Sequence, residues 1–305
     1  MVPNRKEDIN MNMELIKMLR ERTGAGLMEC KQTLQTFHND LDKSTEFLTK
    51  KGMSQADKKA GRSTLEGLVQ GFVRDNQKMG ALVEVNCETD FVAKNTRFTS
   101  FVDHILKLII ENEPSTVEEL LSINMQDGRT VQENLTTLIT TFGENIQIRR
   151  FTRYETNSNS IVGSYIHKDY LTEGKLGVLL QISVVQPETL MDPIFQDFMR
   201  NLLVHIAAST PKYINREQIP NHVLEKQEAI FREAAEKEGK PAILAEKIAH
   251  NRLEKFIKDN CLLDQIYVKD HTKTITNLID ELNEALGAER IHLERFSCFL
   301  KGEAL

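Results

Sequence analysis

Apolar residues recur at helical spacing in the first fifty positions of the chain. Four of them share one face of a predicted helix: Leu27, Cys30, Leu34 and Phe37. A preceding helix is expected to end at Thr23-Gly24, and Leu41, Phe47 and Leu48 indicate a third. Because three short helices enclose only a marginal core, we interpret them as a small docking module.

From Leu65 onward the apolar pattern alternates in the way that is typical of strands. Val69, Gly71 and Val73 alternate first, and a second alternating run follows the turn at 75–80: Ala81, Val83, Val85 and Cys87. This pattern predicts a β-hairpin. A helix is expected next, with an apolar face built from Phe98, Phe101, Val102, Ile105, Leu108 and Ile109.

The same pattern returns further along the chain. LVQGFV (68–73) aligns with IVGSYI (161–166), and MGALVEVN (79–86) aligns with LGVLLQIS (176–183). An amphipathic helix again follows, through Phe195, Phe198, Leu202 and Ile206. We therefore predict an α+β fold whose core is a pseudo-duplication of two hairpin-plus-helix subdomains.

A helical hairpin is predicted as an insertion in the second subdomain, at about 215–258. Gly239-Lys240-Pro241 separates its two apolar stripes, combining a helix stop with a helix-start proline. Such a thin pair is expected to project, and the sequence leaves open whether it forms a homodimer or touches another partner. A last helix stopped by Gly287 and the strand IHLERFSCFL complete the chain. The predicted domains are 1–62 (helical module with a basic linker), 63–156 and 157–305.

The charge balance disfavours wrapping of duplex nucleic acid. The chain has 39 Lys and Arg against 45 Asp and Glu, a net charge of −6. One short segment is basic nevertheless, with Lys50, Lys51, Lys58, Lys59 and Arg62. It is interpreted as a solvated connector, and the alternative is an RNA- or ribosome-associated protein that binds through it.

Sequence motifs for catalysis and for metals are absent. The four cysteines form no C-x-x-C pair and the eight histidines no H-E-x-x-H motif, so we expect neither disulfide, metal nor cofactor. No phosphate-binding glycine loop and no G-x-S-x-G elbow occurs. A thiol enzyme using Cys87 would need a histidine base, for which only His104 and His167 stand nearby. Without a signal peptide or an apolar run of ~20 residues, a cytoplasmic protein without membrane contact is expected.

One segment has no explanation in strand alternation. Residues 84–94 read EVNCETDFVAK, where the second strand of the first hairpin runs out, and the second copy has SVVQPE at that place. Phe91 either packs back into the subdomain core or stands exposed at a tip that only the first copy uses. The pattern alone leaves both open.

The chain resembles a known family at this segment. EVNCETDFVAKN and LRERTGAGLMECKQTL (19–34) are similar to two signatures of bacterial elongation factor Ts, the nucleotide-exchange factor for elongation factor Tu. GENIQIRR (143–150), GSYIH (163–167) and HIAASTP (205–211) match further phrases in order. The resemblance implies an N-terminal domain like the ubiquitin-associated (UBA) fold, a two-part core and a protruding coiled-coil hairpin.

The resemblance also implies roles for particular residues. Thr89, Asp90, Phe91 and Val92 match the motif that dislodges Mg²⁺ from elongation factor Tu, so that GDP leaves and GTP can bind. A second set matches positions that dock on the partner's G domain: Leu19, Arg20, Leu27 and Met28. Leu19 and Leu27 also fit the apolar stripes of the module itself.

The implied function is nucleotide exchange without covalent catalysis, with elongation factor Tu as the partner and no direct nucleic-acid contact. Many family members continue beyond the final strand with a C-terminal helix that contacts the partner. This chain stops at Leu305, and we expect that contact to be missing.

Overall fold

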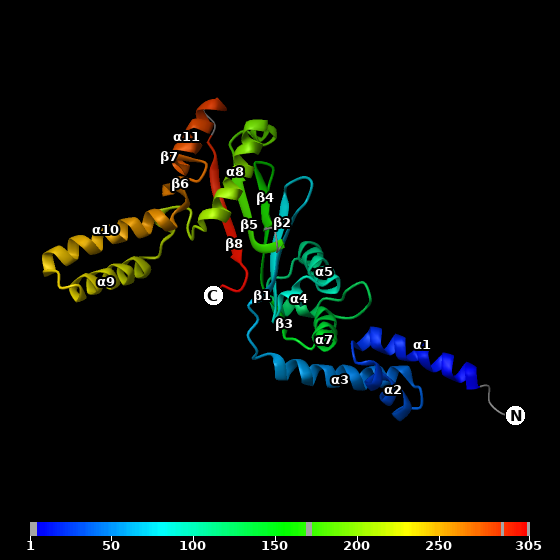
Figure 1. The fold of residues 1–305 in the computed structure, drawn as a ribbon. Coiled ribbons are helices and arrows are strands. Elements are labelled where there is room, and N and C mark those ends of the chain that lie inside the picture. Colours follow the sequence, from blue (N-terminus) through cyan, green and yellow to red (C-terminus); the bar gives the residue numbers. More distant parts are fainter. Residues whose placement is uncertain (1–4, 169–172, 288–289, 304–305) are drawn as a thin grey trace.

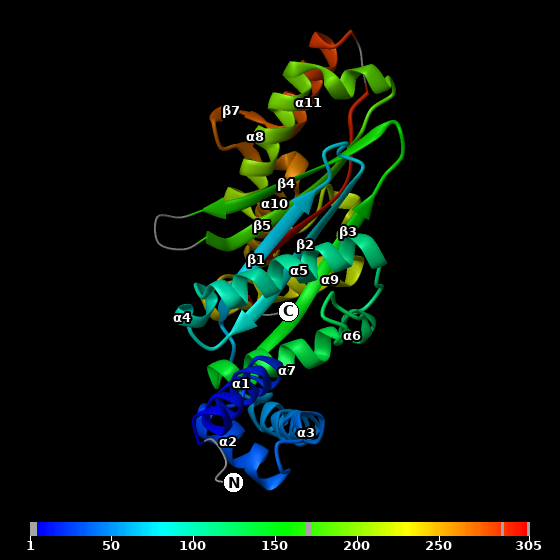
Figure 2. The same cartoon turned by 90° about the vertical axis from the view of Figure 1, so that its right-hand side faces the viewer.

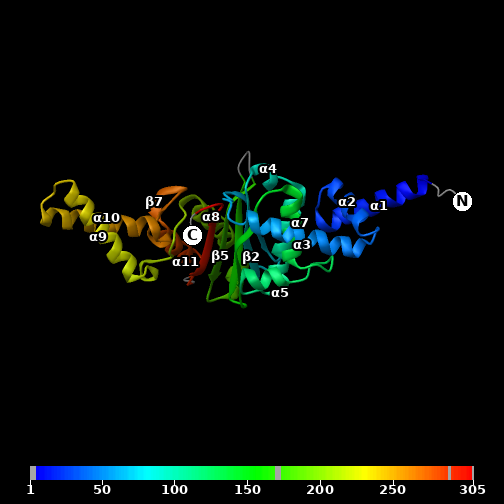
Figure 3. The same cartoon turned by 90° about the horizontal axis from the view of Figure 1, so that it is seen from below.

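The computed structural model, which describes residues 5–168, 173–287 and 290–303, contains two three-stranded sheets packed face to face between layers of helices (Figure 1). Three N-terminal helices lie at one end of the molecule and a long helical pair projects at the other, as Figure 3 also shows. The predicted α+β class is confirmed.

The N-terminal module consists of α1 (Arg5–Thr23), α2 (Leu27–Thr36) and α3 (Leu41–Lys59). Its core holds six buried residues: Ile16, Leu19, Ala25, Cys30, Leu34 and Leu48. Asp40 caps α3 by accepting the Lys43 N–H at 3.0 Å. The helix then continues through most of the predicted basic connector.

Four of the five basic side chains in that connector have partners within the chain. Lys50 pairs with Glu46 and Lys51 with Glu29, while the Lys59 ammonium reaches the Ile139 carbonyl. Arg62 pairs with Glu88. These four side chains therefore take part in local and tertiary contacts within the chain.

The first copy of the repeat begins with the predicted hairpin and ends with a third strand. Its elements are β1 (Glu66–Val73), β2 (Met79–Cys87), α4 (Asp90–Ala93), α5 (Thr96–Asn112), α6 (Val117–Ser122), α7 (Val131–Phe142) and β3 (Ile146–Glu155). The antiparallel sheet has the order β1-β2-β3, and α5 covers one face of it (Figure 2). The sequence pattern did not predict α6, α7 or β3.

The second copy has the same topology. Its elements are β4 (Ser160–Lys168), β5 (Glu173–Ser183), the 3-10 helix η1 (Pro187–Met191), α8 (Pro193–Ser209) and β8 (His292–Leu300). The sheet order is β4-β5-β8, with α8 on its outer face. Both copies carry a bulge at the same place, between Glu84 and Val85 in the first and between Gln181 and Ile182 in the second.

The inner faces of the two sheets pack together around an approximate two-fold relation. Gly80 and Gly177 occupy equivalent positions, and a Cβ on either would lie within 3 Å of side chains from the other copy, at 2.9 Å and 2.6 Å. Arg150 stacks on Phe299 at 4.2 Å, and its counterpart Arg295 stacks on Tyr154 at 4.1 Å. Reciprocal contacts of this kind are expected of two similar halves joined by one interface.

The predicted helical insertion lies between α8 and β8. The predicted range of about 215–258 corresponds to η2 (Arg216–Gln218), α9 (Asn221–Lys237) and α10 (Ala242–Asn260). It is followed by η3 (Leu262–Asp264), β6 (Ile266–Tyr267), β7 (Asp270–Thr274) and α11 (Ile275–Ala285), the predicted last helix. α9 and α10 lie side by side and project from the body (Figures 1 and 3). Buried alanines between them, Ala235, Ala245 and Ala249, let the two helices approach closely. The short ribbon β6–β7 was not predicted.

Candidate partner-binding site

The tip segment, Thr89–Val92, lies where β2 ends and α4 begins. Thr89 has extended backbone angles (φ −127°, ψ 154°), and its hydroxyl oxygen accepts the Val92 N–H at 3.4 Å. This N-cap turns the chain out of the sheet within two residues of Cys87. The strand-to-helix turn therefore brings Asp90 and Phe91 to the outside of the first copy.

A single carboxylate holds the tip segment against the body. The Glu144 oxygens accept the Thr89 N–H at 3.1 Å and the Thr89 hydroxyl at 2.7 Å. On the inner side, the Cys87 thiol donates to the Thr89 carbonyl at 3.2 Å, and Val92 is buried in the core under α5. Three anchors on four residues leave the short helix little freedom to reorient.

Phe91 points away from the body, with 82% of its surface exposed. The reading in which this ring packs back into the subdomain core is therefore wrong, and its neighbour Val92 fills that place. A large aromatic side chain on a rigid, protruding turn forms no contact that stabilises the free protein. Such side chains are common at binding surfaces.

Asp90 presents a charged carboxylate beside this ring. Lys94, one turn later on the same helix, donates to it at 2.8 Å, and this hydrogen bond lowers the pKa of the Asp90 carboxyl. Asp90 is therefore ionised at neutral pH. The tip segment combines one exposed aromatic ring with one anionic group, an arrangement suited to contact with another protein.

The four predicted docking residues of the N-terminal module differ in exposure. Leu19 is completely buried among the three helices, so it can support a docking surface but not form it. Arg20 is exposed, as are Leu27 (46%) and Met28 (63%) at the start of α2. The expectation that Leu27 belongs to the internal stripe of the module is therefore wrong. Figures 2 and 3 place α2 and α4 on the same side of the molecule.

Cys87 is unsuited to act as a nucleophile. Its side chain is fully buried, and burial together with the nearby Glu144 carboxylate raises the pKa of the thiol to about 12. Because the thiolate is the reactive form, this cysteine is chemically inert at neutral pH. Among the described residues, no group of three or more His, Cys, Asp or Glu side chains is arranged to hold a metal ion.

Glu144 is the contributor to the site that sequence reasoning missed. It lies 55 residues from Thr89 and follows α7, which was itself not predicted. Its only signal in the sequence was its place in the phrase GENIQIRR. Separately, no helix in the ranges that the structure describes combines the length and the apolar character required to cross a bilayer.

Comparison with known proteins gives a consistent result over nearly the whole chain. The family model described as elongation factor TS matches residues 88–303. Elongation factor Ts from Clostridium botulinum (strain Eklund 17B / Type B) is 40% identical over 290 residues, which is 95% of this chain and 92% of that protein. The counterparts from Clostridium perfringens (strain SM101 / Type A) and Trichlorobacter lovleyi are each 39% identical over the same shares of the two chains. The chain belongs to the elongation factor Ts family.

Proposed function

We propose that this protein is the guanine-nucleotide exchange factor for elongation factor Tu, and that it acts through the tip segment. Membership of the family gives it a role in translation elongation. The observation that supports the site is the exposure of Phe91, at 82%, on a helix that Glu144, Cys87 and Val92 hold in place. An exposed ring on a fixed base keeps its position when another protein presses against it.

In the proposed mechanism the Phe91 ring enters between side chains of the partner's G domain, and the Asp90 carboxylate comes near the partner's Mg²⁺ site. Mg²⁺ requires nearly ideal octahedral geometry, so a small shift of its ligands releases it. The phosphates of GDP then lose their main counter-charge, and the affinity for GDP falls. By linkage, GDP weakens the binding of the exchange factor by the same factor.

The N-terminal module is proposed to supply a second contact, through Arg20, Leu27 and Met28. Its three helices fit the proposal of a UBA-like docking domain, and α9 with α10 fit that of the family's coiled coil. We also propose domain limits at residues 62 and 156, which fall between α3 and β1 and between β3 and β4. Contact of the helical pair with a second copy stays a prediction.

The test is release of a fluorescent GDP analogue from elongation factor Tu, measured with the unaltered chain and with Phe91→Ala. We expect the unaltered chain to accelerate release strongly and Phe91→Ala to lose most of that acceleration. The matched control is Phe72→Ala, another partly exposed phenylalanine (46%) of the same copy that lies on β1, away from the tip segment. Equal exchange by Phe91→Ala and the unaltered chain would remove the proposed role of the ring.

A further inference from the structure

The turn that follows α7 contacts both parts of this protein that are proposed to bind the partner. Glu144 accepts hydrogen bonds from the tip segment, and the next residue, Asn145, donates a hydrogen bond to the end of the N-terminal module. We propose that Glu144 and Asn145 are positioning residues, which hold the tip segment and the module in one fixed relation so that both meet the partner together. This inference rests on the proposed function.

Glu144 controls the direction of the tip segment. Its two oxygens accept both hydrogen-bond donors of Thr89, the residue that caps α4. Because Phe91 lies two residues beyond this cap and is 82% exposed, little packing orients the ring, and the cap sets where it points. Hydrogen bonds to a charged acceptor are stronger than neutral ones, which suits this function.

Asn145 ties down the chain that leaves α3. Its side-chain amide donates to the carbonyls of Ala60 at 3.2 Å and Arg62 at 3.0 Å, and the side chain is buried. Its backbone N–H donates to Glu88 at 2.6 Å, and the same Glu88 oxygen receives the Arg62 guanidinium at 3.4 Å. The tip segment and the end of the N-terminal module are therefore both hydrogen-bonded to two consecutive residues, Glu144 and Asn145.

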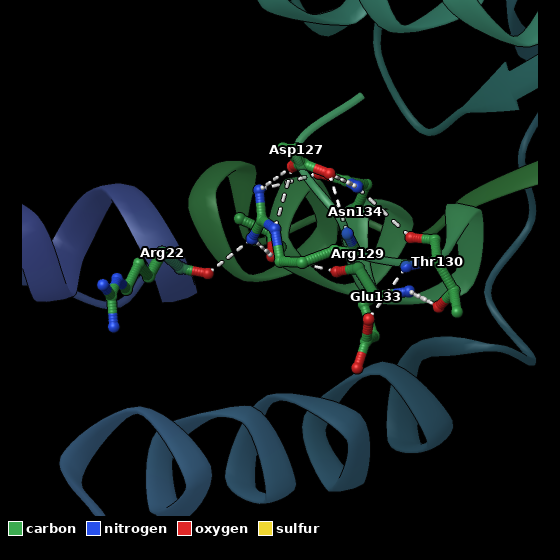
Figure 4. Close-up of polar contacts among 7 residues, drawn as sticks. Arg22, Asp127, Arg129, Thr130, Glu133 and Asn134 are labelled. Carbon is green, nitrogen blue, oxygen red and sulfur yellow. Dashed lines mark hydrogen bonds and ion pairs between the residues drawn. The ribbon is translucent and has the colours of Figure 1, made fainter. Parts of the chain in front are cut away.

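The other end of α7 holds the same module. Arg129 donates to the Arg22 carbonyl at the end of α1 at 2.6 Å, and Asp127 and Asn134 fix its guanidinium (Figure 4). Gly24 lies so close to α7 that a Cβ there would be 2.4 Å from the Thr137 carbonyl. α7 thus spans the module and the tip as a rigid spacer, ~18 Å long for its twelve residues.

The physical advantage lies in binding at two points. When two contacts are held at the correct spacing, forming the first makes the second nearly intramolecular, whereas a loose connection weakens this gain. A flexible tip would also have to be ordered on binding, at a cost in conformational entropy. Residues that contact no partner can therefore change the exchange reaction through geometry alone.

The test uses the full chain with Glu144→Ala, Phe91→Ala and the double variant, in titrations of fluorescent-GDP release from elongation factor Tu. Glu144→Ala is expected to lower the maximal release rate by about ten-fold, the effect of losing a hydrogen bond to a charged group. In the Phe91→Ala background the same change should have little further effect, because a misplaced ring and an absent ring are equivalent. Additive losses would overturn the positioning role.

A conservative variant and a remote one separate positioning from general destabilisation. Glu144→Gln keeps one acceptor oxygen for Thr89 and should restore part of the rate. Asn277→Ala removes a side-chain oxygen that accepts the Thr274 N–H at 3.0 Å in the capping box of α11, which belongs to the second copy and not to α7. We expect it to lower the melting temperature while leaving the maximal rate unchanged; a rate loss like that of Glu144→Ala would count against positioning.

Two further measurements distinguish this inference from the proposed function. In the free protein, Glu144→Ala should increase amide hydrogen exchange over residues 88–94, whatever the partner is. Unchanged protection would show that Glu144 does not hold the tip segment in place. Asn145→Ala should chiefly raise the half-saturating concentration, because it loosens the module and not the ring. If the unaltered chain fails to release GDP, the proposed function fails; if it succeeds and Glu144→Ala matches it, only the positioning role fails.

Discussion

The two copies of the repeat share one scaffold and differ at the turn that the proposed function uses. Strand order, the bulge in the central strand pair and the helix on the outer face are the same in both. Equivalent phenylalanines, Phe98 and Phe195, are completely buried under the two sheets. The segments between the outer helix and the last strand differ, with α6 and α7 in the first copy and η2 to α11 in the second. Within the shared scaffold the copies also differ at the bulge, at one helix position, and at the turn that follows the central strand.

At the bulge, the first copy buries a charge and the second does not. The Glu84 carboxylate is fully buried and accepts from Arg150 at 2.7 Å, from Asn86 at 3.1 Å and from the Gly302 N–H at 2.8 Å. In the second copy Gln181 takes this place and accepts from Arg295 at 2.9 Å. The chain that follows β8 thus donates a hydrogen bond to the buried Glu84 carboxylate of the first copy. This contact joins the two copies close to the end of β2, from which the tip segment begins.

The turns after the central strands differ in chemistry although they leave the same scaffold. The most exposed large apolar side chain of each turn is Phe91 at 82% in the first copy and Met191 at 80% in the second. Only the first presents an aromatic ring next to an acid, on a helix capped by Thr89 and held by Glu144. The scaffold is therefore present twice, whereas the arrangement that the proposed function requires is present in the first copy alone.

The largest expected change in stability comes from substitution of the buried Glu84 at the bulge. Glu84→Ala should lower the free energy of unfolding by ~3–5 kcal/mol, because Arg149 and Arg150, both largely buried, lose the Glu84 carboxylate, although Arg150 keeps its pair with Glu303. The matched change in the second copy, Gln181→Ala, removes a bond to an arginine that is more exposed and should cost only ~1–2 kcal/mol. Urea denaturation of both variants measures the difference, and equal losses would show that the two bulges are energetically alike.

The elements that the sequence predicted are those with a regular apolar period. Both hairpins, α5 and α8 have it, and the structure has them at the expected places. β3 was missed because Arg149, Arg150 and Arg153 interrupt its pattern. Besides Glu155 of the same strand, their charges are compensated by Glu84, Glu113 and Glu303 from elsewhere in the fold. Such compensation depends on tertiary contacts and has no local signal.

α7 was missed for a different reason. Threonine is a weak helix former, and this helix contains Thr136, Thr137, Thr140 and Thr141, each of which donates its hydroxyl to the carbonyl four residues earlier. The tip segment was found because its polar run contradicts strand alternation. Glu144 could not be found in this way, since the contact that matters joins residues 55 positions apart.

A change in stability of intermediate size is expected at the helix position where α5 has Leu108 and α8 has His205. His205 is completely buried; its Nδ1 accepts the Val268 N–H at 3.3 Å and its Nε2 faces the Gln265 amide oxygen at 3.0 Å, which fixes the neutral ring. Burial lowers the pKa of His205 below its ordinary value of 6.5. Between the two pKa values, His205 therefore binds a proton in the unfolded chain but stays neutral in the folded chain.

Stability should consequently fall as the pH drops below 6.5, by at most about 1.4 kcal/mol per pH unit, until the folded histidine itself is protonated. His205→Leu, which copies the first repeat, should flatten this dependence between pH 7 and 5, even if its stability at pH 7 is lower. His104→Gln on exposed α5 surface is the control and should keep the original slope. An unchanged slope in His205→Leu would assign the acid sensitivity to other groups.

The smallest expected effect on stability is the one that most sharpens the comparison of the two turns. Phe91→Ala and Met191→Ala each remove a side chain that is about four-fifths exposed, so both should change the free energy of unfolding by no more than roughly 0.5 kcal/mol. Truncation of a buried phenylalanine costs ~3–5 kcal/mol instead, because it also leaves a cavity. Thermal melts of both variants, compared with their nucleotide-release rates, therefore separate binding from folding.

Two unchanged melting temperatures with slow release only for Phe91→Ala would place the exchange activity in the first copy alone. Equal slowing by Met191→Ala would instead mean that both turns meet the partner, and that the duplication was kept for binding as well as for rigidity.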